Sequence, residues 1–201
     1  MQGMTEGKTE GQTERKTEGK TERKTERKTE RNGEACSVLS SHDEGAMTVI
    51  DMMPGSERYL EDCKTALMES ELGRVYFSDE GKAQQAIIEG ITRKELLVAL
   101  DADGACLGFL WMIPNGAFHG FPYLHIIAVK PACRGLGVGS RMLRYFEEVL
   151  CIGANKAFLV VADFNPKAKQ LYERIGYHEV GCVPDLYKQG VTEHVMMKVL
   201  G

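Results

Sequence analysis

Hydrophobic and polar positions change their spacing several times along this chain, and each change predicts a new element. Apolar residues in continuous or alternating runs are typical of strands; such runs occupy 46–53, 95–100, 105–113, 123–129, 157–163, 177–183 and 194–200. Apolar residues at helical spacing occupy 57–72, 79–91, 137–150 and 165–176. The resulting order, β, α, α, β, β, β, α, β, α, β, β, predicts one α/β domain with a single sheet.

Turn and capping residues mark the element boundaries. Pro54-Gly55 ends the first strand, and Ser56 is expected to cap the first helix. The run Asp101-Ala102-Asp103-Gly104 predicts a hairpin, and Asn165 with Pro166 predicts a helix start. Hairpins in the middle and at the end, with a strand–helix–strand unit between them, predict a mixed sheet. Residues 123–129 are apolar on both faces and are therefore expected to form a central strand.

The N-terminal segment has a different pattern, because Thr recurs at every fourth position from Thr5 to Thr29 in a T-E-x-K-like repeat without apolar residues. A segment with nothing to bury cannot join a core. We expect residues 1–45 to form a disordered tail and linker that the domain at 46–201 does not need for folding or activity.

Composition narrows the function classes. The net charge of −4 argues against a general nucleic-acid binder. No apolar run reaches the length of a membrane span or a secretory signal, so we expect a cytoplasmic protein without a membrane partner. The six cysteines have long gaps between them and are expected to be reduced and mostly buried. We expect no metal, because the one His/Asp/Glu group, 42–44, falls in the linker.

A glycine-rich loop, "KPACRGLGVGS" at 130–140, joins the predicted central strand to the next helix. Free backbone N–H groups at a helix start form an anion site, and glycine lets phosphate oxygens approach the backbone. A dinucleotide site would need G-x-G-x-x-G close to the strand end; here the spacing is G-x-G-x-G, although Asp163 imitates the ribose-binding acid. A P-loop would need a Lys before Ser140, and glycine stands there.

Two motifs resemble the GNAT superfamily of acyl-CoA-dependent N-acetyltransferases. "RGLGVG", 134–139, fits its R/Q-x-x-G-x-G/A motif, and "NPKAKQLYERIGY", 165–177, fits its signature N-x-x-A-x-x-L-Y-x-x-x-G-F/Y. The resemblance covers 46–200. It implies a single-domain GNAT-like α/β fold, with a mixed central sheet and helices on both faces. It also implies transfer of the acetyl group of acetyl-CoA to a primary amine in a ternary complex, without a metal.

The resemblance also implies the cofactor-binding residues. In the family the central strand bulges and separates from its neighbour, and the pantetheine arm pairs with it as an added strand would. Backbone contacts to pantetheine are therefore expected from Ile127, Ala128 and Val129, with an N–H near Val129 stabilising the oxyanion. Asn165 is expected to cap its helix and to contact the cofactor. Backbone N–H groups for the pyrophosphate are expected from Arg134, Gly135, Leu136, Gly137, Val138, Gly139 and Ser140.

Candidate catalytic residues follow from the same comparison. Tyr172 is the candidate acid for the leaving thiolate, with a core aromatic residue as the alternative. His125 is the candidate base, with a structural histidine as the alternative. Cys133 lies in the phosphate loop and is not expected to be a nucleophile. Further base candidates are His119, Tyr123, Glu193 and His194.

The acceptor site is expected between the first two helices and the last hairpin, with the loop 114–122 as a gate. Tyr187, Glu193 and Asp185 are candidates to hold a cationic amine, although exposed acids are usually only solvated. A small-molecule amine and a protein N-terminus both stay open as acceptors. The alternative function is a non-catalytic acyl-CoA-binding regulatory module, against which the presence of Tyr172 argues. A homodimer paired through edge strands also stays open.

Overall fold

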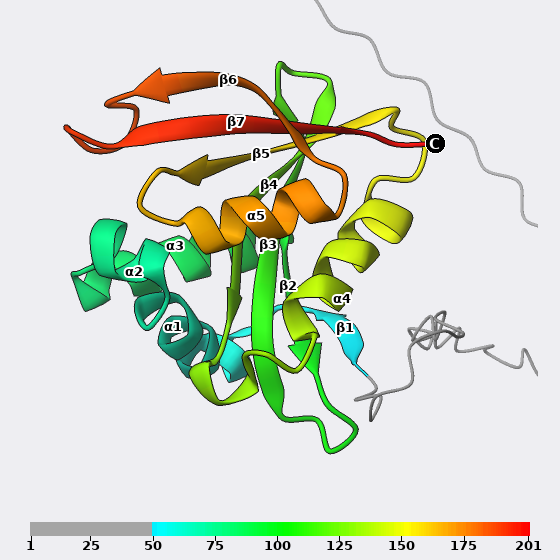
Figure 1. Ribbon diagram of the computed structural model, residues 1–201. Coiled ribbons are helices and arrows are strands. Elements are labelled where there is room, and N and C mark those ends of the chain that lie inside the picture. Colours follow the sequence, from blue (N-terminus) through cyan, green and yellow to red (C-terminus); the bar gives the residue numbers. More distant parts are fainter. Residues whose placement is uncertain (1–49) are drawn as a thin grey trace, which may run out of the picture. The chain divides into compact units, whose positions relative to one another are not determined.

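The computed structural model describes residues 50–201 and contains one seven-stranded sheet of order β1-β2-β3-β4-β5-β7-β6 (Figure 1). The predicted tail at 1–45 and the first residues of the predicted first strand lie outside the described residues, so the domain boundary stays a prediction. The strands are β1 (Asp51–Pro54), β2 (Leu96–Leu100), β3 (Cys106–Ala117), β4 (Phe121–Val129), β5 (Lys156–Ala162), β6 (His178–Pro184) and β7 (Thr192–Val199).

The sheet is mixed, as the hairpin signals predicted. Only β4 and β5 run parallel, and all other neighbours are antiparallel. The helix α4 (Val138–Tyr145) lies between these two strands in the sequence, which makes them the expected strand–helix–strand unit. Strand β7 lies between β5 and the edge strand β6. The predicted central position of β4 is confirmed.

Helices cover both faces of the sheet, and each face has its own core. On one face α1 (Leu60–Met68) and α3 (Glu80–Thr92) pack on side chains that include Phe109 and Ile126. On the other face α4 and α5 (Pro166–Arg174) pack on Leu110, Leu124 and Leu159. Figure 1 shows α4 and α5 together on one side of the strands. The expected fold class is therefore confirmed.

Strand β4 contains a bulge at His125. Trp111 of β3 pairs with Ile126, but the next residue of β3, Met112, pairs with Leu124, so His125 has no partner of its own in the register. The extra residue interrupts the alternation of side chains, and Leu124 and Ile126 consequently belong to the cores of opposite faces.

Beyond this bulge β4 and β5 separate. Their register contains only two pairs, Tyr123 with Phe158 and Leu124 with Leu159, and β5 continues from there along β7 alone. The bulged and separated central strand that the family resemblance implied is therefore present.

The predicted single helix at 57–72 is wrong. The segment forms a 3-10 turn, η1 (Glu57–Tyr59), then α1, and a separate helix, α2 (Glu71–Tyr76). Ser56 makes no side-chain capping bond. Ser70 does so instead, because its hydroxyl accepts the Gly73 N–H at 2.9 Å and donates to the Leu67 carbonyl at 2.6 Å. This local cap competes with helix continuation and turns the chain.

Gly73 is required at the corner between α1 and α2. A Cβ atom at this position would lie 1.9 Å from the carbonyl oxygen of Leu67, so only glycine fits without moving the backbone. The helix predicted at 137–150 is only partly α-helical. The α-helix α4 ends at Tyr145, and the chain then forms a π-helical turn, η3 (Phe146–Leu150).

Candidate active site

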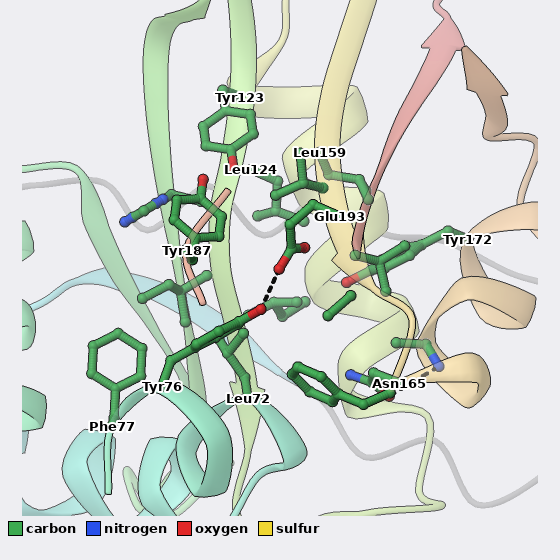
Figure 2. Close-up of a pocket in the computed structure, with 18 residues that line it drawn as sticks. Leu72, Tyr76, Phe77, Tyr123, Leu124, Leu159, Asn165, Tyr172, Tyr187 and Glu193 are labelled. Atoms are coloured by element: carbon green, nitrogen blue, oxygen red, sulfur yellow. Dashed lines mark hydrogen bonds between the residues drawn. The ribbon is translucent and has the colours of Figure 1, made fainter. Parts of the chain in front are cut away.

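A cavity of about 310 Å³ lies where β4 and β5 separate (Figure 2). Its walls include residues 124–127 of β4 and residues 159–162 of β5. Helices α2 and α5, the segment between β6 and β7, and β7 itself complete the lining. The site therefore combines segments from both ends of the described chain with the central strand.

The glycine-rich loop supplies a helix start with free N–H groups. The first helical bond of α4 runs from the Arg141 N–H to the Gly137 carbonyl. The N–H groups of the preceding first-turn residues, 138–140, therefore have no acceptor within their helix. Gly135 and Gly137 adopt φ values of +78° and +79°, a conformation that glycine accepts without strain. This donor set at the positive end of a helix fits a diphosphate.

Arg134 differs in part from its expected role. Its N–H already donates to the Pro131 carbonyl at 3.2 Å. Its guanidinium donates to the Val129 carbonyl at 3.0 Å and to the Glu69 carbonyl at 3.2 Å. Arg134 therefore fixes the loop against the end of β4 and the end of α1, and the expected phosphate contacts fall to the residues that follow it.

The three β4 residues expected to bind pantetheine lie on the separated part of the strand. Ile127, Ala128 and Val129 pair with β3 on one side, and the register with β5 ends before them. Their backbone therefore faces the gap without a strand partner among the described strands, which suits the amide groups of a pantetheine arm. Ile127 also lines the cavity. Together with the helix start, these residues fit coenzyme A.

Asn165 and Tyr172 both line the cavity from α5. Asn165 caps this helix, as predicted, and its side chain accepts the Ala168 N–H at 3.4 Å. Tyr172 follows seven residues later on the same helix face and directs its hydroxyl toward the cavity (Figure 2). Burial raises the pKa of Tyr172 to about 12, so the hydroxyl is protonated near neutral pH.

His125 lines the cavity at the bulge of β4. Its ring meets Trp111 edge-on, with ring centroids 4.6 Å apart. Burial lowers the pKa of His125 below its usual 6.5, so the imidazole is neutral near pH 7 and has a nitrogen able to accept a proton.

Among the described residues, Glu193 of β7 is the one charged residue that is buried. Only 2% of its surface is exposed, and it lines the cavity. Its carboxylate accepts a hydrogen bond from the hydroxyl of Tyr76, at the end of α2 (Figure 2). Burial and this carboxylate raise the pKa of Tyr76 above its ordinary value. The ring of Tyr76 lies 5.5 Å from that of Phe164 and 5.9 Å from that of Tyr187.

A family model described as "Acetyltransferase (GNAT) family" matches residues 61–177. The chain belongs to the GNAT acetyltransferase family. This match ends before β7, so it includes the phosphate loop and α5 but not Glu193.

Two curated relatives support the family from sequence. An uncharacterized N-acetyltransferase of Methanocaldococcus jannaschii is 31% identical over 100 residues, which are 49% of this chain and 62% of the relative. A blasticidin-S acetyltransferase of Streptomyces morookaense is 34% identical over 85 residues, 39% of this chain and 58% of the relative. The chain thus spans about three fifths of the length of these relatives.

Solved structures show the same fold. An acetyltransferase of the GNAT family from Bacillus cereus aligns with a TM-score of 0.60 at 17% identity, covering 76% of this chain and 99% of that one. Ard1 from Thermoplasma volcanium aligns with a TM-score of 0.61 at 20% identity, covering 76% and 98%. These likenesses confirm the GNAT fold.

Several residues that the sequence analysis considered for the active site do not line the cavity between β4 and β5. The 114–122 segment forms the β3–β4 hairpin, where Phe118 and Phe121 pack on Phe158 with centroids 5.3 and 5.4 Å away. None of 114–122 lines the cavity, and the expected gate stays a prediction. Asp185 is also outside, and its carboxylate accepts the Gly190 N–H at 2.6 Å. His119, Cys133 and His194 do not line the cavity either.

Sequence reasoning undervalued one side chain that lines the cavity and missed others. Glu193 was a candidate base and a candidate to hold a cationic amine, with an exposed, solvated acid as the alternative; it is buried in the cavity wall, so the exposed alternative is wrong. Tyr76 and Phe164 were missed because no motif contains them; the aromatic pair Tyr76-Phe77 at the end of a helical stretch was the available signal.

Within residues 50–201 we find no helix suited to span a membrane and no His, Cys, Asp and Glu grouping able to hold a metal ion. Five of the six cysteines are in this part of the chain and are free thiols, three of them buried: Cys63, Cys106 and Cys151. Cys36 lies outside the described residues.

Proposed function

We propose that the chain is an N-acetyltransferase that transfers the acetyl group of acetyl-CoA to a primary amine by direct attack. The observation that carries this proposal is the separation of β4 from β5 beside the helix start of α4, with the Tyr172 hydroxyl at the gap. Acetyl-CoA supplies a thioester, an acetyl group already activated for attack. The edge of residues 127–129 that has no β5 partner and the N–H groups after Arg134 would hold it, and Asn165 would contact it from α5.

The carbonyl oxygen of a thioester gains negative charge when an amine attacks it. A backbone N–H near Val129, on the part of β4 without a β5 partner, would donate to that oxygen. Such a donor is aligned before the reaction and needs little reorganisation, which lowers the barrier.

Tyr172 serves the leaving sulfur. The C–N bond forms, the C–S bond breaks, and the proton lost by the amine balances the thiol that is released. A free thiol has a pKa of about 8.5, so complete transfer from a phenol of pKa about 12 would leave a costly phenolate. Tyr172 therefore donates a hydrogen bond as charge grows on sulfur and keeps its own proton. The proton that the amine loses passes to the base and from there, directly or through solvent, to the released thiolate.

The amine must be neutral when it attacks. Two groups in the cavity wall can accept its proton, the neutral imidazole of His125 and the carboxylate of Glu193. His125 lies on the separated central strand, and Glu193 lies on β7 across the cavity. His125 remains the proposed base.

The relatives' names specify different acceptors: blasticidin S in one case, and the ε-nitrogen of thialysine in a pig enzyme that is 41% identical over 59 residues, 29% of this chain and 35% of the relative. The family relationship therefore supports acetylation of an acceptor, but it does not identify which amine is acetylated. A cytoplasmic location is part of the proposal because acetyl-CoA is an intracellular metabolite. A homodimer and the absence of a nucleic-acid partner stay predictions.

Thiol release from acetyl-CoA across a panel of amines tests the proposal. Tyr172→Phe should bind acetyl-CoA as the wild type does and turn over about 100-fold more slowly, the usual contribution of a positioned acid. Tyr59→Phe, on a half-buried ring outside the cavity, is the matched control. Binding of acetyl-CoA without thiol release for any amine would favour the non-catalytic module instead.

A further inference from the structure

We propose that the acceptor is a cationic primary amine with no carboxylate next to the reacting nitrogen, held by the Glu193 carboxylate inside an aromatic wall. This inference rests on the proposed acetyl transfer and specifies the class of amine that the site selects.

The first argument is the buried charge of Glu193. Only 2% of its surface is exposed, and its carboxylate accepts a hydrogen bond from the neutral hydroxyl of Tyr76. No lysine or arginine in residues 50–201 forms an ion pair with it. A buried carboxylate without a counter-ion is costly, and it has more acceptor positions than the one that Tyr76 uses. An ammonium group entering the cavity would supply the missing positive charge.

The second argument is the aromatic lining. Faces of aromatic rings attract cations, most strongly where water is excluded. Tyr76 contacts two of the other rings edge-on, and the hydroxyls of Tyr123 and Tyr187 face each other above it (Figure 2). The aromatic residues around the cavity are Tyr76, Phe77, Tyr123, Phe164, Tyr172 and Tyr187.

The third argument is the charge of the other side chains that line the cavity. No lysine or arginine lines the cavity, and its histidine, His125, is held neutral by burial. The carboxylate of a free α-amino acid would therefore enter without a partner and would approach Glu193, a like charge. The same site would accept an amine whose neighbouring carboxyl group is absent or neutralised as an amide.

A structural role for Glu193 predicts something different. If the carboxylate only held α2 against β7 through Tyr76, a glutamine would serve, because its amide oxygen also accepts a hydroxyl. Glu193→Gln therefore keeps the shape and this hydrogen bond and removes only the charge.

The test compares three amines on one scaffold: phenethylamine, phenylalaninol and phenylalanine. They differ at one carbon, which carries hydrogen, hydroxymethyl or carboxylate. Thiol release from acetyl-CoA by the full chain should give a kcat/KM about 100-fold lower for phenylalanine than for the other two, as expected for an unpaired charge brought near a like charge. Isopentylamine, leucinol and leucine repeat the comparison on a smaller scaffold.

Glu193→Gln should raise the KM for phenethylamine at least tenfold and bring the preference over phenylalanine close to one. Its affinity for acetyl-CoA, measured by titration, should stay at the wild-type value because the phosphate loop is untouched. Glu173→Gln is the matched control, since this glutamate is exposed on α5 and does not line the cavity.

Equal use of phenylalanine and phenethylamine on both scaffolds would overturn the inference and leave the acetyl-transfer proposal intact. Equal rejection of phenylalaninol and phenylalanine would overturn it too, because discrimination would then be steric. A Glu193→Gln enzyme with wild-type KM and preference would show that the charge has no part in recognition. Absence of thiol release with every amine would overturn the proposed function and this inference with it.

Discussion

A single methyl group at the corner between α1 and α2 should damage the acceptor side of the site from a distance. In Gly73→Ala the new Cβ would lie 1.9 Å from the Leu67 carbonyl oxygen, where real contacts do not fall below 3.0 Å. Backbone cannot rotate away as a side chain can, so α1 and α2 must move apart by about 1.1 Å. Tyr76, at the end of α2, would move with its helix.

The magnitude follows from the contacts that this movement breaks. Overpacking a tight site costs about 1–3 kcal/mol. The Leu67 carbonyl accepts the Ser70 N–H at 3.0 Å and the Ser70 hydroxyl at 2.6 Å, and each lost bond costs about 1 kcal/mol. Alanine regains about 1 kcal/mol of helix propensity over glycine. The variant should therefore be about 3 kcal/mol less stable than the wild type.

Urea unfolding measures this loss of stability. Steady-state kinetics shows whether the acceptor side or the acetyl-CoA side of the site is affected. The KM for the amine should rise, because Tyr76 no longer meets Glu193 in its native geometry, while the affinity for acetyl-CoA should hardly change. Gly181→Ala is the control, since a Cβ there meets nothing within 4 Å and the residue is exposed on β6. A Gly73→Ala protein within 0.5 kcal/mol of the wild type, with unchanged KM, would refute the steric reasoning.

Two further predictions concern the phosphate loop and the bulge of β4. Gly137→Ala, at φ +79°, should cost about 1 kcal/mol of stability and weaken acetyl-CoA binding in a titration; Gly104→Ala, at φ +78° in the β2–β3 hairpin, should cost the same and leave binding unchanged. The pKa of His125 is lowered by burial, so the unfolded chain binds this proton more readily than the folded one, and the contribution of His125 to stability is present above pH 6.5 and decreases as pH falls below it. Urea unfolding between pH 7.5 and 5.5 should show that loss in the wild type and not in His125→Asn; identical slopes would contradict the assignment.

The parts of the molecule that the sequence predicted share one physical property. Phosphate binding by backbone N–H groups needs a particular main-chain conformation, and that conformation favours glycines close together in the sequence: Gly135, Gly137 and Gly139. The helix start at Asn165 and the hairpin at 101–104 are likewise indicated by capping and turn residues within a short stretch of sequence. Of the residues that motifs of this kind predicted, Asn165 and Tyr172 line the cavity, and their roles toward the cofactor stay predictions.

The acceptor side could not be predicted in the same way. The bond between Tyr76 and Glu193 joins residues 117 positions apart, and no local pattern shows that they meet. The break at Ser70 was readable as an N-cap followed by Glu71, but helical spacing of apolar residues continued through it and obscured the corner. The burial of Glu193 involves Tyr76 and other side chains from distant segments, and it is therefore a property of the folded chain alone.

The span between Tyr76 and Glu193 has a consequence for how the acceptor preference can change over time. Residues 121–172 carry the central strand, the phosphate loop and Tyr172 as one uninterrupted block, which recombination could transfer between genes intact. Tyr76 of α2 and Glu193 of β7 lie outside this block, one before it and one after it, so a gene that inherits only one of their segments by recombination would lose the hydrogen bond between them. New amines should therefore be acquired through paired point changes in α2 and β7 more readily than through exchange of segments.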